Sequence, residues 1–176
     1  HTHSEWNSAQ CLARGDGYVP WLRRVLETVR TPGDTEAGIS STPCLMAEAG
    51  IAYIGDFGAT DSAVARGLVA GRHYHEFLRS GCPSPTPASL APHAVHTINT
   101  ETWEALRGYD GFLAVHVGES EEEMRIYSHG DGPLAELLLE RDFSPRHIAT
   151  LVADGGPVHF LDRLGLLGPR TLLVHA

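Results

Sequence analysis

Two short apolar runs in this chain are each followed directly by a histidine. This pattern restricts the folds that the chain can adopt more than any other feature of the sequence. The runs are 112–115, which His116 follows, and 171–174, which His175 follows. Short apolar runs bounded by turn residues indicate strands that are buried on both faces, as in parallel sheets. Enzymes with an α/β barrel carry their catalytic groups at the carboxyl ends of such strands. The two histidines are therefore candidate site residues of an α/β protein.

Helical periodicity alternates with short β-rich runs along the chain, which is typical of a parallel sheet or barrel. We predict helices over 20–30, 35–50, 61–70, 101–107, 121–127, 133–140 and 157–166, and strands over 51–54, 73–77, 112–117 and 170–174. Residues 78–92 are rich in Pro and Ser, and an irregular link is expected there in place of a crossover helix.

The chain length indicates part of a barrel. A complete eight-stranded barrel needs roughly 250 residues, whereas this chain has 176. We therefore expect a partial (β/α)8 TIM-type barrel that forms a single domain over residues 1–176. This partial barrel would lack the start of the first strand and the last two βα units.

Turn and capping residues mark the expected ends of several elements. Residues 31–34 (Thr-Pro-Gly-Asp) are expected to end the first helix, and Pro43 is expected to kink the second. Asp61 is the expected N-cap of a helix that ends before Gly71. Thr100 is the expected N-cap of the next helix.

Charge and cysteine content limit the classes of partner. The formal net charge of −9 argues against nucleic acid and anionic membranes, because both need a basic surface. A small-molecule substrate is the expected partner. The open edges of an incomplete barrel also favour a homo-oligomer.

The cysteines indicate the redox compartment. Cys11, Cys44 and Cys82 are widely spaced and form no C-x-x-C motif, so we expect buried, reduced thiols in a cytoplasmic protein.

The absence of lysine narrows the chemistry further. All thirteen basic residues are Arg, which excludes a Schiff-base lysine and a P-loop lysine within this stretch. The carboxylated lysine that bridges two metals in some barrel hydrolases is absent as well. A site with a single metal ion is therefore favoured.

The chain begins with an H-x-H motif, His1-Thr2-His3. On a strand end, both imidazoles of such a motif point to one side, because side-chain direction repeats every two residues. Two neutral imidazoles suit Zn²⁺ or Fe²⁺. The motif alone has low specificity: His73 and His75 form a second copy, for which solvated or loosely packed histidines are the simpler interpretation.

The segment from His116 to Glu119 is more informative. Burying an imidazole after four apolar residues costs free energy unless the ring has a partner. Glu119 follows three residues later, where a carboxylate can shuttle a proton. A core histidine followed by a helix-capping glutamate explains the same pattern. His93 has two interpretations as well, a strand-end residue that contacts substrate or a loop histidine.

Five short segments contain these residues: His1-Thr2-His3, 50–56 (Gly-Ile-Ala-Tyr-Ile-Gly-Asp), 91–94 (Ala-Pro-His-Ala), 116–122 (His-Val-Gly-Glu-Ser-Glu-Glu) and 173–176 (Leu-Val-His-Ala). In order and spacing they resemble the deaminase branch of the amidohydrolase superfamily. This branch includes methylthioadenosine/S-adenosylhomocysteine deaminases, aminodeoxyfutalosine deaminases and triazine hydrolases. The run 130–134 (Gly-Asp-Gly-Pro-Leu) is most similar to the aminodeoxyfutalosine deaminase group, although a turn before a helix explains it too.

The resemblance implies a metal site. His1 and His3 would bind one divalent metal from the end of the first strand, and His116 would be the third ligand. Zinc is the expected metal, with iron as the alternative. The family's fourth ligand is an Asp after the eighth strand, which would lie beyond residue 176, so we expect little activity from this chain alone.

The resemblance also implies the reaction, hydrolytic deamination of a purine nucleoside-like substrate of the aminodeoxyfutalosine type. Glu119 would protonate a ring nitrogen of the substrate, His175 would orient or polarise the attacking water, and His93 would contact the substrate.

Two alternatives remain open at this point. A chlorohydrolase or guanine deaminase of the same superfamily would share these residues. A truncated, non-catalytic metal-binding remnant would retain them without the reaction. The other fold of zinc deaminases needs H-x-E and P-C-x-x-C, and Cys82-Pro83 does not fit that spacing.

Overall fold

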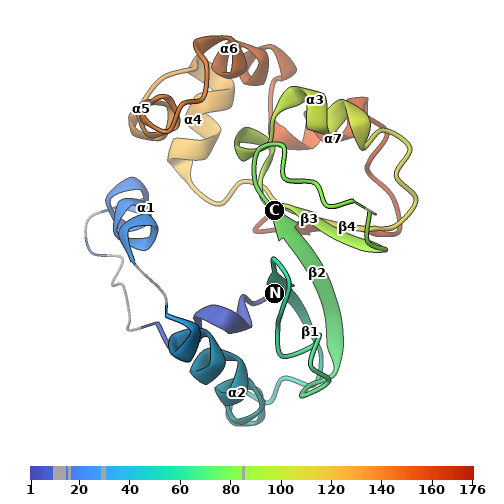
Figure 1. Cartoon of the computed structure of the whole chain (residues 1–176). Coiled ribbons are helices and arrows are strands. Elements are labelled where there is room, and N and C mark those ends of the chain that lie inside the picture. Colours follow the sequence, from blue (N-terminus) through green and yellow to red (C-terminus); the bar gives the residue numbers. More distant parts are fainter. Residues whose placement is uncertain (10–14, 16, 29–30, 85) are drawn as a thin grey trace. The chain divides into compact units, whose positions relative to one another are not determined.

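The computed structural model describes residues 1–9, 15, 17–28, 31–84 and 86–176 (Figure 1). The chain divides into two compact units, His1–Glu76 and Phe77–Ala176. Each unit carries parallel β-strands together with helices, as expected for an α/β protein. None of the helices in the described ranges combines the length and the hydrophobicity needed to cross a bilayer.

The first unit contains two paired strands. Its elements are the 3-10 helix η1 (Ser4–Trp6), α1 (Tyr18–Glu27), α2 (Pro32–Glu48), β1 (Ile54–Gly58) and β2 (Gly71–Phe77), whose last residue belongs to the second unit. β1 and β2 run parallel, in register from Ile54 opposite Gly71 to Gly58 opposite His75. Gly71 lies so close to β1 that a Cβ atom there would come within 2.4 Å of the Ile54 carbonyl oxygen. β2 confirms the strand expected over 73–77, whereas β1 begins at the last residue of the expected strand 51–54.

Residues 31–34 begin a helix and do not end one, so that prediction was wrong. Thr31 Oγ1 accepts a hydrogen bond from the Asp34 N–H at 3.2 Å, and the Asp34 carboxylate accepts one from the Thr31 N–H at 3.0 Å. This reciprocal pair is a capping box, which satisfies two N–H donors at the start of α2. Pro43 lies inside α2 as expected. α1 ends at Glu27, and residues 29–30 of the expected helix lie outside the described residues.

The helix expected after Asp61 is absent, because residues 61–70 form turns and bends. Side chains take up the N–H groups in this segment. The Asp61 carboxylate accepts from the Ser62 N–H, and Ser62 Oγ accepts from the Ala65 N–H. Gly67 then adopts a left-handed backbone with φ 70°, which ends any helical path.

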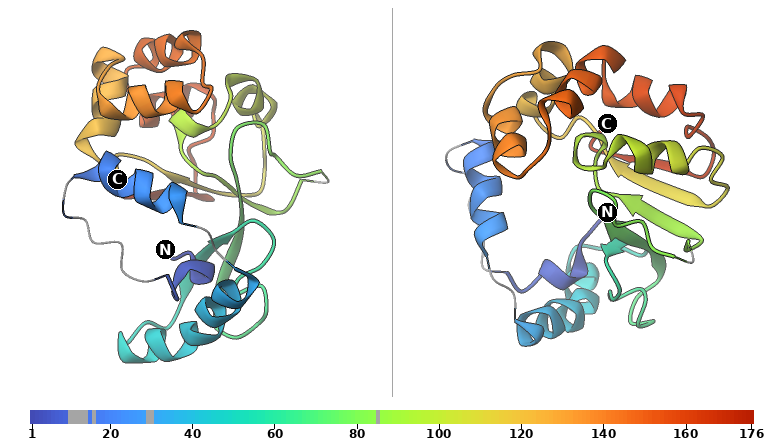
Figure 2. Two further views of the ribbon diagram at one scale, coloured as in Figure 1. Left: turned by 60° about the vertical axis from the view of Figure 1, so that its left-hand side comes forward. Right: turned by 45° about the horizontal axis from the view of Figure 1, so that its top comes forward.

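The second unit contains three strands in sequence order, with β4 between β3 and β5, and both pairs are parallel. Its elements are β3 (Ser89–Pro92), the 3-10 helix η2 (Val95–Thr97), α3 (Thr100–Ala105), β4 (Phe112–His116), α4 (Glu121–His129), α5 (Pro133–Glu140), α6 (Pro145–Asp154), α7 (Pro157–Arg163) and β5 (Thr171–Val174). Helices α4, α5 and α6 pack side by side (Figure 2).

β4 is the central strand of this unit, and its Leu113, Ala114 and Val115 are almost fully buried. The strand ends at His116, one residue before the predicted end at Val117. The helices expected over 121–127, 133–140 and 157–166 and the strand expected over 170–174 are confirmed, with ends that shift by a few residues.

One boundary and two elements in the second unit differ from expectation. The N-cap of α3 is Asn99, so Thr100 is the first helical residue. α6 was not predicted, although Ser144 caps it with a hydrogen bond from the His147 N–H and Gly155 ends it in the left-handed conformation.

The segment expected to be irregular over 78–92 is so only in part. Residues 78–84 and 86–88 carry no helix, as expected, but 89–92 form the strand β3, which was not predicted.

The cysteines differ from the expectation of buried thiols. Cys44 is exposed and Cys82 is half-buried, both as free thiols, and Cys11 lies outside the described residues.

Trp103 anchors the segment that follows β3. Its side chain is 1 % exposed, contacts Phe160 edge-to-face at 5.6 Å between ring centroids, and donates a hydrogen bond from Nε1 to the Val95 carbonyl oxygen at 3.2 Å. This bond links α3 to η2, close to His93.

We expect Trp103→Phe to lower the free energy of unfolding by about 2 kcal/mol, because the buried Val95 carbonyl loses its indole donor. Urea denaturation followed by circular dichroism measures this change. A free energy of unfolding within about 0.5 kcal/mol of the wild-type value would contradict this role, since changes of that size are typical of surface substitutions.

Candidate active site

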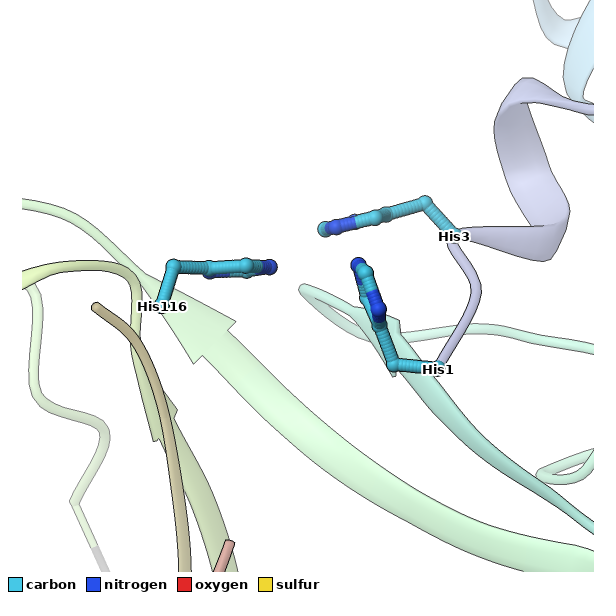
Figure 3. A group of neighbouring side chains, drawn as sticks. All are labelled: His1, His3 and His116. Carbon is cyan, nitrogen blue, oxygen red and sulfur yellow. The ribbon is translucent and has the colours of Figure 1, made fainter. Parts of the chain in front are cut away.

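The first unit places His1 and His3 together at its N-terminal segment. Their ring centroids are 5.7 Å apart, and each ring packs against Phe57 of β1, at 5.4 Å and 5.5 Å. Figure 3 shows both imidazoles projecting from this segment toward the same side. The H-x-H motif therefore presents two nitrogen ligands to one side, as its spacing predicts.

A buried carboxylate holds this segment against β1. Asp56 is fully buried, and its two oxygens accept hydrogen bonds from the Ser4 N–H at 3.0 Å and the Val64 N–H at 3.2 Å. Thr2 adds a parallel bridge to Asp56, with the Thr2 N–H donating to the Gly55 carbonyl at 2.9 Å. The backbone on both sides of His3 is thereby fixed.

Glu76, near the end of β2, lies beside His3. The distance between His3 Nδ1 and a Glu76 carboxylate oxygen is 3.5 Å. Burial lowers the pKa of His3, but Glu76, with smaller contributions from Glu5 and Asp56, raises it above the ordinary value overall. A metal ion at His3 would compete with a proton for the ring, and the raised pKa extends this competition to higher pH.

The second H-x-H copy lies in a different setting. His73 and His75 are half-buried residues within β2 and not at its end. His73 Nδ1 lies 2.9 Å from the hydroxyl oxygen of Ser62, and burial lowers the pKa of His73. A packing role explains this copy.

The second unit fixes His116 at the end of β4. Its side chain is buried, and its Nδ1 lies 2.7 Å from the carbonyl oxygen of His93. Because a carbonyl oxygen only accepts, Nδ1 carries the hydrogen and the lone pair of the neutral ring is on Nε2. Ligand histidines in metal sites are oriented in this way by a bond from the other ring nitrogen.

His93 and His175 flank His116. The ring centroids of His93 and His116 are 5.0 Å apart, and those of His116 and His175 are 5.6 Å apart with the rings stacked. His93 directly follows β3 and His175 directly follows β5. Of the two interpretations of His93, the structure agrees with the position directly after a strand, and three imidazoles gather at the carboxyl ends of three parallel strands.

Glu119 lies in the loop that follows β4. Gly118, with φ 68°, turns the chain between the strand and this residue. A Glu119 carboxylate oxygen is 4.0 Å from His175 Nε2, and the Glu119 side chain is 16 % exposed. An open groove of about 640 Å³ begins at Glu119 and continues along α4, past Met124 and Arg125. The carboxylate is thus reachable from outside the unit.

Two buried polar residues beside this loop were missed at the sequence level. Glu123 is 1 % exposed and His96 is 4 % exposed, and a Glu123 carboxylate oxygen lies 3.8 Å from His96 Nδ1. Burial raises the pKa of Glu123, and burial lowers the pKa of His96 to about 3. One signal for Glu123 was available, since Ser120 and Glu123 have the S-x-x-E spacing of a capping box.

The comparisons with known proteins give one relevant likeness. No family model matches the chain. A curated aminodeoxyfutalosine deaminase from Deinococcus radiodurans is 32 % identical over 95 residues, which cover 49 % of this chain and 22 % of that protein. The chain thus spans about a fifth of the length of the relative that it matches. This similarity supports a distant relation to the deaminases of the amidohydrolase family.

The predicted site residues fall into two groups. His1 and His3 lie together in the first unit, whereas His93, His116, His175 and Glu119 lie together in the second. Their roles as metal ligands and catalytic groups remain predictions.

The low pKa of His96 makes stability depend on pH. The unfolded chain binds a proton at a pKa near 6.5, whereas folded His96 does so only near 3. The contribution of His96 is therefore present above the unfolded pKa and is lost as the pH falls. Between pH 7 and pH 5 we expect wild type to lose about 2 kcal/mol more than His96→Asn, whose amide does not titrate. Urea denaturation at both pH values measures this difference, and equal losses in the two proteins would refute it.

Proposed function

We propose that the protein carrying this sequence is a metal-dependent aminohydrolase that removes an amino group from a purine nucleoside-like substrate of the aminodeoxyfutalosine type. The observation that carries the proposal is the cluster of His93, His116, His175 and Glu119 in the second unit. A proton-transfer carboxylate and a buried, oriented imidazole at the ends of parallel strands suit hydrolysis with an activated water.

The chain's histidines fit a divalent metal. His116 is buried, with its hydrogen on Nδ1, so that Nε2 offers the lone pair that a ligand needs. His1 and His3 present two further imidazoles from a segment that Asp56 immobilises. We propose that these three residues bind one ion together. Imidazole ligands suit zinc, with iron as the alternative.

A bound metal of this kind supplies a water that is ionised near neutral pH. Side chains of the protein carry out the remaining steps. The carbon that bears the amino group gains the oxygen of this water, and Glu119 gives a proton to the adjacent ring nitrogen. The proton of the added hydroxyl passes to the amino group as the bond from that carbon to the amino group breaks, so ammonia leaves and a carbonyl remains. The proton released when the water ionised returns Glu119 to its protonated form. His175, beside Glu119, orients the attacking water through a hydrogen bond.

The substrate class follows from the relative and from the site together. The relative's name states aminodeoxyfutalosine as its substrate. The groove beside Glu119 gives room for a substrate larger than a free base. His93, which directly follows β3, contacts the substrate in this proposal.

Metal binding can be tested on the purified chain. We expect about one equivalent of zinc or iron by elemental analysis, and its loss in His1→Ala/His116→Ala, because two of three ligands are gone. The double variant His129→Ala/His159→Ala removes two exposed histidines and should retain the metal. Absence of metal after zinc is added, or its loss in both double variants, would contradict the proposed ligands.

The catalytic role of Glu119 can be tested in the complete gene product that contains this sequence. We expect Glu119→Gln to lower kcat for deamination by about 10²–10⁴-fold, because the amide cannot transfer a proton. Metal content should stay unchanged. Release of ammonia from aminodeoxyfutalosine and adenosine measures the rate. Wild-type turnover in Glu119→Gln would remove Glu119 from the mechanism.

A further inference from the structure

The backbone around Glu119 is held by a buried carboxylate in α4. Glu123 Oε2 accepts a hydrogen bond from the Glu119 N–H at 2.8 Å, and the Gly118 N–H also donates to this carboxylate. Glu123 in turn is 1 % exposed. A carboxylate bonded to backbone N–H groups forms a charge-assisted contact, which is stronger than a bond between neutral groups.

This arrangement departs from an ordinary helix cap. Ser120 is the N-cap of α4, and its hydroxyl oxygen accepts from the Glu123 N–H at 3.0 Å. In a capping box, the glutamate would return a bond to the N–H of the cap residue itself. Glu123 instead binds the two residues before the cap, Gly118 and Glu119. The bond is therefore directed at the loop that carries the proposed proton donor.

α6 shows that a helix with a serine N-cap can begin without a buried glutamate in its first turn. Its N-cap, Ser144, accepts from the His147 N–H at 3.1 Å, as Ser120 does in α4. His147 stands at the position that corresponds to Glu123, and it is not fully buried. Burying a carboxylate costs free energy, so the location of Glu123 calls for a role beyond starting α4.

His96 connects the same carboxylate to the loop after β3. Its Nδ1 lies 3.8 Å from Glu123 Oε1, and neither atom has a hydrogen-bond partner among the described residues. One proton between these two atoms would satisfy both. The carbonyl oxygen of His96 lies 2.9 Å from His147 Nε2 of α6, which limits movement of this residue. The loops that carry His93 and Glu119 are thus joined through one buried pair.

We propose that Glu123 and His96 are positioning residues that fix the backbone of Gly118 and Glu119, so that the Glu119 carboxylate is held for proton transfer. This inference rests on the proposed function, because it assigns a purpose to Glu119. Glu119 must reach both the substrate nitrogen and His175, which is 4.0 Å away. Displacement of a reacting group by 1 Å can lower the rate about 10²-fold. A loop that holds the Glu119 carboxylate in place therefore maintains the rate of proton transfer.

The first experiment measures amide hydrogen exchange by NMR on the 176-residue chain, without substrate. We expect Glu123→Ala to speed exchange at the Glu119 and Gly118 amides at least tenfold more than at Ile126, in the middle of α4. Glu123→Gln retains one acceptor oxygen and should give a smaller increase. Thr31→Ala, which removes the side-chain N-cap of α2 in the first unit, should leave the Glu119 amide unchanged. Equal increases at Glu119 and Ile126 in both Glu123 variants would overturn the proposal.

The second experiment measures deamination in the complete gene product. We expect Glu123→Ala to lower kcat about 10²-fold with little change in KM or metal content, and Glu123→Gln to recover part of the loss. Thr31→Ala should lower the melting temperature and leave kcat unchanged. If Glu123→Ala does not fold, Glu123→Gln alone decides, and a wild-type kcat together with wild-type exchange would overturn the positioning role.

The two proposals can fail separately. A wild-type protein without deaminase activity would overturn the proposed function, and with it the catalytic purpose assigned to Glu119. The exchange measurement would still show whether Glu123 holds the loop. An active wild type whose kcat and Glu119 exchange are insensitive to Glu123 would overturn the positioning role alone.

Discussion

A single carbonyl oxygen, that of His93, organises the site in the second unit. It accepts two hydrogen bonds from His116, one from the backbone N–H at 2.9 Å and one from ring Nδ1 at 2.7 Å. The first bond sets the register between the end of β4 and the loop after β3. The second fixes the ring's rotation and its tautomer. The stacking of His175 on His116 depends on a ring that cannot turn.

The first unit uses the same principle with a different acceptor. There the buried Asp56 carboxylate binds backbone N–H groups on either side and holds the segment of His1 and His3. In both units an oxygen acceptor fixes the backbone that carries an imidazole. Such preorganisation avoids part of the entropy that flexible side chains lose when they bind an ion.

Local patterns placed one of the candidate site residues and left another open. The apolar run before His116 was sufficient to place it at the end of a strand, whereas no strand was predicted before His93, which could equally be a loop residue. The helix expected after Asp61 goes no further than one helical bond, from the Arg66 N–H to the Ser62 carbonyl, because Gly67 then adopts a left-handed backbone. The N–H groups before this bond donate to Ser4 and Asp56, which are distant in sequence, and no local pattern records such bonds.

Two features of the structure, α6 and the buried His96, were not predicted although the sequence contained signals for them. α6 has a serine cap, a proline in its first turn and a terminal glycine, all readable in advance. His96 follows buried Ala94 and Val95, so the argument that drew attention to His116 applied there as well. The partner of a buried histidine is the part that sequence cannot supply, because Glu123 lies 27 positions away from His96 on another element.

The left-handed turn at Gly118 has a consequence for chirality. A Cβ atom at this residue would meet nothing within 4 Å, so space does not exclude a side chain there. The backbone does, since φ is 68° and L-residues rarely adopt this region. A D-alanine would keep both the turn and the open space. The position therefore discriminates by handedness and not by size, and among the natural residues glycine alone enters this conformation without strain.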